Sequence, residues 1–174
     1  MNIPSSQKLT NFVKKITIKK MTLLIIYLLI ALITSFLCSL MEAVLLSTPM
    51  TFLKINEKST NSGLKKLIKA KNNLDKPLSA ILSLNTIAHT VGAAGVGAQA
   101  NIVFGEAYFG YVSAALTILI LVLTEIFPKT IGARYWRNLT SLIGHFISIT
   151  IIITYPLVVF SAVLTKLVSK NKTV

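Results

Sequence analysis

Long apolar runs alternate with short basic segments along the chain. Three runs, at about residues 22–46, 78–104 and 111–130, are long enough to cross the hydrocarbon core of a bilayer as helices. A fourth apolar stretch covers residues 139–168, and hydropathy alone predicts a fourth span there. Runs of this length predict an all-α membrane protein.

The segments between the runs are polar. Residues 1–20 form a basic N-terminal tail, for which a short surface helix and disorder are both open, and residues 169–174 form a C-terminal tail. The loop 48–76 carries seven lysines and two acidic residues, and it predicts a short amphipathic helix after Gly63. The turn at 105–110 has no basic residue.

Composition and charge agree with a membrane protein. Hydrophobic residues make up 53% of the chain and charged residues 13%, and the mean hydropathy is +0.73. The net charge is +13, but the basic residues border the apolar runs, which argues against nucleic-acid binding. The lysines of loop 48–76 predict that this loop is cytoplasmic, which places the N-terminus outside if the first run crosses fully. Residues 1–20 carry five lysines, so a first run that enters the membrane only partly is the alternative. We expect a multi-pass membrane protein in contact with lipid.

Three polar residues lie at similar depth in successive runs. Glu125 ends an uncharged stretch, where a carboxylate is costly unless it is paired or ligated. Ser39 and Asn85 lie toward the same basic ends of their own runs. Oxygen groups of this kind suit Mg²⁺, or alternatively Na⁺, better than a soft transition metal. An ion pair between Glu125 and Lys129, one helical turn later, is the alternative.

Several other residues support a site at this depth: Ser35, Glu42, Thr86, His89, Thr124 and Pro128. Ser35, Ser39 and Glu42 share one face of a helix because they are spaced i, i+4 and i+7. Pro128 lacks a backbone N–H, so it is expected to loosen the helix beside Glu125. Small residues between 92 and 100 predict close helix packing, inside the bundle or at a dimer interface.

The sequence gives no support for an enzyme. It lacks the His-Glu-x-x-His and Gly-x-Ser-x-Gly elements, and it has no pair of intramembrane aspartates. Phosphate-binding glycine loops are also missing, so no ATP site is expected.

The order of the polar motifs resembles the transmembrane domain of the CNNM/CorC magnesium transporters. The motifs are Ser39-Leu40-Met41-Glu42, Leu84-Asn85-Thr86 and Thr124-Glu125-Ile126-Phe127-Pro128-Lys129-Thr130. The resemblance covers about residues 22–168. It implies a homodimer with three spans per subunit, and it implies that 139–168 is a juxtamembrane belt helix on the cytoplasmic side, bent at Pro156. It also implies a cation held by Ser39, Asn85 and Glu125. Our leading hypothesis is therefore a dimeric carrier in a bacterial inner membrane that moves Mg²⁺, or a related cation, outward.

The chain departs from the family pattern near this site. Met41 stands where a hydroxyl is common, Leu84 and Thr124 stand where glycines are common, and His89 replaces an asparagine. Glycines permit close backbone approach to an ion, and a thioether is a poor ligand for a hard cation. Besides the Mg²⁺ carrier, we therefore keep a non-transporting dimerisation or partner-binding module with a degraded site. A third hypothesis is a proton- or Na⁺-linked variant that uses His89 with Glu125.

Typical family members continue into cytoplasmic paired cystathionine-β-synthase-type (CBS) domains that bind ATP. The sequence ends at Val174 without them, so we expect a stand-alone membrane domain. A separate CBS-containing partner is an accompanying expectation.

Overall fold

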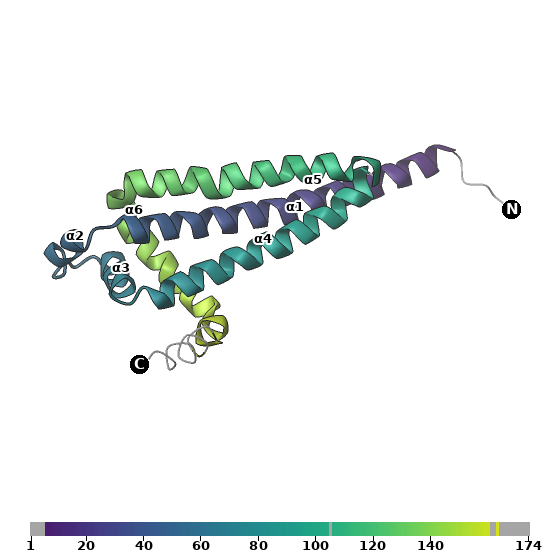
Figure 1. Ribbon diagram of the computed structural model, residues 1–174. Coiled ribbons are helices and arrows are strands. Elements are labelled where there is room, and N and C mark those ends of the chain that lie inside the picture. Colours follow the sequence, from purple (N-terminus) through teal and green to yellow (C-terminus); the bar gives the residue numbers. More distant parts are fainter. Residues whose placement is uncertain (1–5, 105, 161–162, 164–174) are drawn as a thin grey trace, which may run out of the picture.

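The computed structural model describes residues 6–104, 106–160 and 163 of the chain. Its elements are α1 (Ser6–Ser47), α2 (Met50–Ile55), α3 (Ser62–Asn72), α4 (Asp75–Phe104), α5 (Glu106–Ile120), the π-helix η1 (Leu121–Ile126) and α6 (Phe127–Ile153). No strand occurs in these residues, which confirms the predicted all-α class. Figure 1 shows α1, α4 and α5 running along one another, with α2 and α3 at one end.

Three stretches are long and apolar enough to span a membrane: Met21–Ser47, Asp75–Ile102 and Ser113–Ile153. The first two agree with the predicted runs to within a few residues. The basic N-terminal tail is not a separate element, because α1 begins at Ser6 and continues without a break into the first span. Residues 1–5, Gly105 and the C-terminal tail lie outside the described residues.

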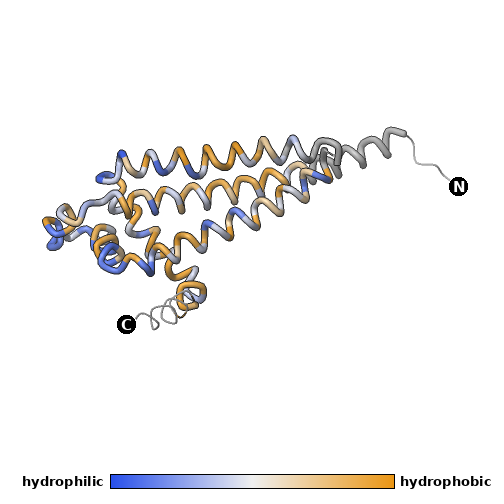
Figure 2. The backbone as a smooth tube through the Cα atoms, in the orientation of Figure 1, coloured by the Kyte–Doolittle hydropathy of each residue, from blue (hydrophilic) through white to orange (hydrophobic). Residues whose placement is uncertain are grey.

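Hydrophobic residues predominate along the three long helices, whereas hydrophilic residues gather at the end formed by α2 and α3 (Figure 2). Ile30, Ile118 and Ile152 are 60%, 64% and 74% exposed. Exposed apolar surface over this length is unfavourable in water and favourable against lipid tails. The surface of the fold is therefore that of a membrane-embedded bundle.

The third long helix changes character close to Pro128. From Leu121 to Ile126 it is a π-helix, and the backbone N–H of Phe127 donates to the carbonyl of Val122, five residues back. Pro128 has no N–H to donate and its ring crowds the carbonyl four residues earlier. The wider π turn accommodates this loss, so the expected loosening takes the form of a π-helical segment.

Beyond Pro128, α6 bends at Tyr135, whose φ of −108° and ψ of 20° are not helical. After this bend α6 crosses α1 and α4 obliquely (Figure 1). It ends at Ile153, and residues 155–160 are helical again after a turn at Thr154. The expected helix 139–168 thus begins a few residues earlier, after the bend at Tyr135, and the helix is interrupted at Thr154, two residues before Pro156. The prediction for residues 161–162 and 164–168 concerns positions outside the described residues.

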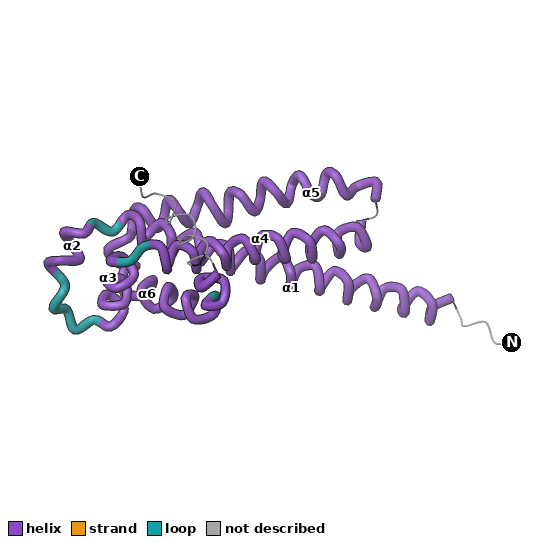
Figure 3. Tube along the Cα trace, turned by 60° about the horizontal axis from the view of Figure 1, so that its bottom comes forward, coloured by secondary structure: helices purple, strands orange, loops and turns teal. Residues whose placement is uncertain are grey.

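The buried core lies where α3 and α6 meet the end of α1. Val44, Leu45, Leu67, Ile143 and Ile147 are all at most 1% exposed. Figure 3 shows α3 and α6 together at this end of the bundle. The polar end of the molecule is therefore the best packed, and it fixes the ends of the helices that carry the candidate site residues.

Two glycines allow α3 and α6 to approach closely. A Cβ added at Gly63 would collide with the carbonyl oxygen of Ser141, and one added at Gly144 would collide with the carbonyl of Gly63. Asn61 Oδ1 caps α3 by accepting from the amides of Gly63 and Leu64. Ser141 Oγ donates to the same oxygen at 2.8 Å. The start of α3 is thus fastened to α6.

Lys71 joins the other end of α3 to α1. Its Nζ donates to the carbonyls of Leu45 at 2.7 Å and Leu46 at 3.0 Å. These carbonyls belong to the last turn of α1, where no intrahelical partner exists. Burial lowers the pKa of Lys71. The ammonium acts as a C-terminal cap supplied by a neighbouring helix.

Small residues also bring α1 and α4 together. A Cβ added at Gly92 would collide with the Cβ of Ala31, and one at Gly95 would lie 3.2 Å from the ring of Tyr27. The glycine-rich part of α4 therefore packs against α1 of the same chain, which is one of the two arrangements that its sequence predicts.

Candidate functional site

Polar side chains from α1 and α4 meet inside the bundle. Ser35 Oγ donates to Asn85 Oδ1 at 2.7 Å, and it lies 2.8 Å from His89 Nε2. A serine hydroxyl has one proton, so Nε2 of His89 is the donor in the second contact. Asn85 and His89 are one turn apart on α4 and therefore face α1 together.

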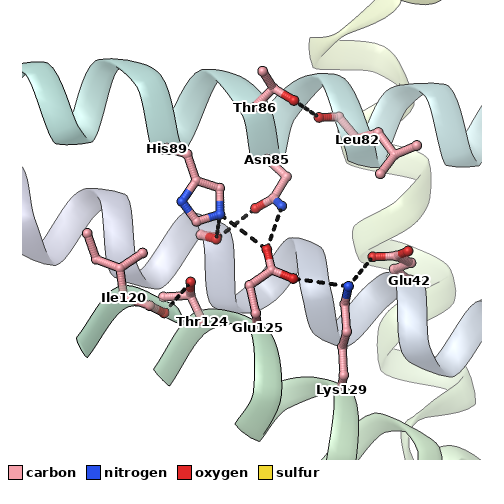
Figure 4. A network of polar contacts seen from close by, with 10 residues as sticks. Glu42, Leu82, Asn85, Thr86, His89, Ile120, Thr124, Glu125 and Lys129 are labelled. Atoms are coloured by element: carbon pink, nitrogen blue, oxygen red, sulfur yellow. Dashed lines mark hydrogen bonds and ion pairs between the residues drawn. The ribbon is translucent and has the colours of Figure 1, made fainter. Parts of the chain in front are cut away.

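Glu125, on the π-helix η1, completes the cluster from the third long helix. Its Oε1 accepts from Asn85 Nδ2 at 3.2 Å and lies 3.3 Å from His89 Nε2. The side chain of Glu125 is 25% exposed. Figure 4 shows Asn85, His89 and Glu125 turned toward one another. Two of the three predicted ligands, Asn85 and Glu125, are thus in direct contact.

Lys129 carries the network on to a second carboxylate. Its Nζ lies 3.0 Å from Glu125 Oε2 and 3.3 Å from Glu42 Oε2 on α1. The ion pair that the sequence offered as an alternative is therefore present, and it coexists with the contacts from α4. The sequence did not predict the link to Glu42, because it joins two helices far apart in the chain.

Ser39 lies between these groups on α1, four residues after Ser35 and three before Glu42. It is 1% exposed, and its Oγ has no hydrogen-bond partner among the described residues. Buried hydroxyls are nearly always hydrogen bonded, because leaving one unpaired costs about 1–3 kcal/mol. An unpaired buried oxygen on this face of α1 fits a ligand that the folded chain alone does not supply.

Three other predicted residues, Thr86, Thr124 and Pro128, do not contribute side chains to the cluster around Glu125. Thr86 Oγ1 donates to the carbonyl of Leu82 and points away from Glu125 (Figure 4). Thr124 is fully buried and donates to the carbonyl of Ile120 at 2.8 Å. Pro128 is buried and acts through the backbone, by ending the π-helix.

Met41, which stands in the first motif, faces α6. Its sulfur lies 3.6 Å from Thr150 Oγ1, which donates to it. The thioether is therefore engaged with α6, and the hydrogen bonds and ion pairs that join Asn85, His89 and Glu125 do not include it.

A groove opens onto the cluster between α4 and α5. Its volume is about 490 Å³, and its walls include His89, Ala93, Thr117, Leu121 and Glu125. His89 and Glu125 are the only charged or titratable groups in this wall. The carboxylate is therefore reachable from the outer surface of the bundle, while Ser39 is closed off behind it.

The donor set fits a hard cation better than a soft one. Ser39 Oγ, Asn85 Oδ1 and the Glu125 carboxylate are oxygens, which Mg²⁺ prefers. Within the described residues no group of three or more His, Cys, Asp or Glu side chains gathers in one place, so a histidine- and cysteine-rich transition-metal centre is not built here. A cation at this place would have to displace the ammonium of Lys129.

The fold and this network define a multi-pass helical membrane protein with a charged cluster between its spans. Residues 24–173 match the family described as the Cyclin M transmembrane N-terminal domain, CNNM. The chain belongs to this family.

Two curated bacterial relatives agree with this assignment. The UPF0053 protein sll1254 of Synechocystis is 36% identical over 129 residues, which are 74% of this chain and 37% of that protein. A UPF0053 protein of Haemophilus influenzae is 32% identical over 143 residues, 82% of this chain and 34% of that protein. The chain therefore spans about a third of the length of the curated relatives it matches.

Proposed function

We propose that the protein carries a divalent cation, Mg²⁺, outward across a bacterial inner membrane. Glu125 would supply the charge, and Asn85 and Ser39 would supply neutral oxygens. The observation that carries the proposal is the position of Glu125, held against Asn85 at 3.2 Å on a π-helical segment between two other spans. Ionisable groups inside membrane spans most often mark an ion path.

The cluster would respond to a cation in a definite order. Both oxygens of Glu125 are already occupied, Oε2 by Lys129 and Oε1 by Asn85 and His89. An entering cation takes the place of Lys129 at Oε2, and the ammonium keeps its contact with Glu42. Asn85 then turns its Oδ1, now held by Ser35, toward the ion. Release reverses these exchanges, so the empty carrier is never left with an unpaired carboxylate.

The ion pair between Glu125 and Lys129 favours a second candidate function, a membrane module that dimerises or binds a partner without transport. The charge of Glu125 is neutralised by Lys129, as in a structural ion pair. A third candidate, coupling to Na⁺ or protons, draws on the contact between His89 Nε2 and Glu125 Oε1.

Orientation and assembly belong to the same proposal. The lysines around α2 and α3 favour a cytoplasmic position for that end, with the N-terminus outside. The crossing half of α6 would then lie along the cytoplasmic face as a belt. We also propose a homodimer, and a separate CBS-containing protein as a cytoplasmic partner.

Flux of Mg²⁺ through proteoliposomes containing the full chain tests the proposal. Glu125→Gln keeps the size of the side chain but removes the charge, so it should abolish Mg²⁺ flux. Glu57→Gln, in the exposed loop between α2 and α3, is the matched control and should transport normally. Unchanged flux in Glu125→Gln refutes the carrier mechanism.

The other candidates give different results in the same assay. A non-transporting module shows no flux in the unmodified chain, with the dimer intact. Coupling through His89 requires that flux depend on a Na⁺ or proton gradient, and that this dependence disappear in His89→Ala.

A further inference from the structure

A second groove, remote from Glu125, lies where α3, the start of α4 and α6 meet. Its volume is about 450 Å³. One side carries the lysines Lys66, Lys69 and Lys76, and the other side carries Ile147 and Ile151 of α6. A cationic wall opposite an apolar wall is an amphipathic site, suited to a ligand with an anionic head and a hydrocarbon part.

The charge in this groove is uncompensated. No acidic side chain lines it, and Asp75, the nearest acid in sequence, stays outside the lining. Lys66, Lys69 and Lys76 are exposed and have no hydrogen bond or ion pair with the described residues. By contrast, Lys71 of the same helix is engaged with the end of α1. Three unpaired ammonium groups around one hollow would attract an anion.

The architecture directs these lysines into one place. Lys66 and Lys69 are three residues apart on α3 and share a face, next to the buried face that packs on α6. Lys76 stands in the first turn of α4, immediately before Pro77. The second membrane-spanning stretch begins at Asp75, so the groove opens at the border of the span. Phospholipid headgroups lie at that depth.

The apolar wall continues toward the lipid phase. Ile151 is half-buried in the groove, and the next residue, Ile152, is 74% exposed on the outside of α6. A headgroup phosphate among the lysines would therefore leave the acyl chains beside exposed isoleucines of α6. A soluble phosphate compound would use only the cationic wall.

From these features we infer that the groove between α3, α4 and α6 binds the headgroup of an anionic phospholipid. Its phosphate is held by Lys66, Lys69 and Lys76, and its acyl chains lie along Ile151 and α6. The bound lipid ties α3 and α6 to the membrane surface. This role is independent of ion transport.

Native mass spectrometry of the full chain, released from detergent, tests the inference with three probes. Dioleoyl-phosphatidylglycerol should bind at least roughly tenfold more tightly than dioleoyl-phosphatidylcholine, because each lysine near an anionic headgroup adds to the favourable binding free energy. Glycerol 1-phosphate, which has the headgroup phosphate and no acyl chain, should bind weakly. Equal affinity for the two lipids overturns the inference. Tight binding of glycerol 1-phosphate also overturns it, because the groove would then be a site for a soluble phosphate compound.

Two triple variants test whether lipid binding depends on the lysines of the groove or on the basic surface as a whole. Lys66→Gln/Lys69→Gln/Lys76→Gln should lose at least about tenfold in phosphatidylglycerol affinity. The control, Lys54→Gln/Lys58→Gln/Lys65→Gln, removes the same charge from exposed positions outside the groove and should change affinity by less than about threefold. An equal loss in both variants assigns the binding to the basic surface as a whole and overturns the inference.

Discussion

Lys129 Nζ lies 3.0 Å from Glu125 Oε2, so the proposed ion-binding carboxylate already has a cation of its own. Lys129→Gln removes this competitor and keeps a polar side chain. We expect the affinity for Mg²⁺ to rise roughly fivefold, because a partly exposed ion pair is worth up to about 1 kcal/mol. Calorimetric titration of the purified protein with Mg²⁺ measures the change. A weaker affinity would mean that Lys129 supports the site instead of competing for it.

Ser39→Ala should separate folding from ion binding. The hydroxyl is buried and unpaired, so its removal should leave the free energy of unfolding unchanged or raise it by about 1 kcal/mol. The same change should weaken Mg²⁺ binding if Ser39 is a ligand. Unfolding in mixed micelles and Mg²⁺ titration give the two numbers. Ser148→Ala on α6, where the hydroxyl donates to a backbone carbonyl, is a control that should not affect Mg²⁺.

His89 should set the preference among divalent ions. An imidazole nitrogen binds Zn²⁺ better than an amide oxygen does, whereas Mg²⁺ prefers oxygen. His89→Asn should therefore leave Mg²⁺ flux in place and reduce its inhibition by Zn²⁺ by roughly tenfold. Flux of Mg²⁺ in proteoliposomes, titrated with Zn²⁺, provides the measurement. Equal inhibition of both proteins would place His89 outside the ion path.

Gly144→Ala should be strongly destabilising, because the added methyl collides with the carbonyl of Gly63. Overpacking of this kind costs about 3 kcal/mol when backbone must move. Gly110→Ala is the matched control, since an added Cβ there meets no atom within 4 Å. It should change stability by less than about 1 kcal/mol. Comparable losses in the two variants would show that α3 and α6 are not held at this distance.

Lys71→Met should weaken the attachment of α3 to α1. Methionine keeps most of the length of the side chain but leaves the carbonyls of Leu45 and Leu46 without their donor. The expected loss in unfolding free energy is about 1 kcal/mol. Lys65→Met, at an exposed position of α3, should have no measurable effect on unfolding in the same mixed micelles. If both variants unfold like the parent chain, the cap contributes nothing.

The sequence predicted the long helices well because hydropathy over a span is a local property. It also placed Asn85 and Glu125 at similar depth, and they are in contact at 3.2 Å. It did not predict the bridge from Lys129 to Glu42 or the cap by Lys71, since both depend on how separate helices dock. The bend at Tyr135 lies only four residues before the predicted start at 139, so the sequence separated the third span from the crossing half of α6 nearly in the right place, but it did not predict that the two halves form one bent helix.

The π-helical segment has a consequence for comparing this chain with its relatives. A π turn holds one residue more than an α turn, so the helix after it is rotated by about 100° relative to the helix before it. The apolar faces of α5 and α6 are therefore out of phase when both are drawn on one helical wheel. Deleting a single residue between Leu121 and Thr124 would restore the phase and swing Glu125 away from Asn85. A one-residue gap in an alignment at this place would mark the loss of the cluster, even if every polar residue were still present.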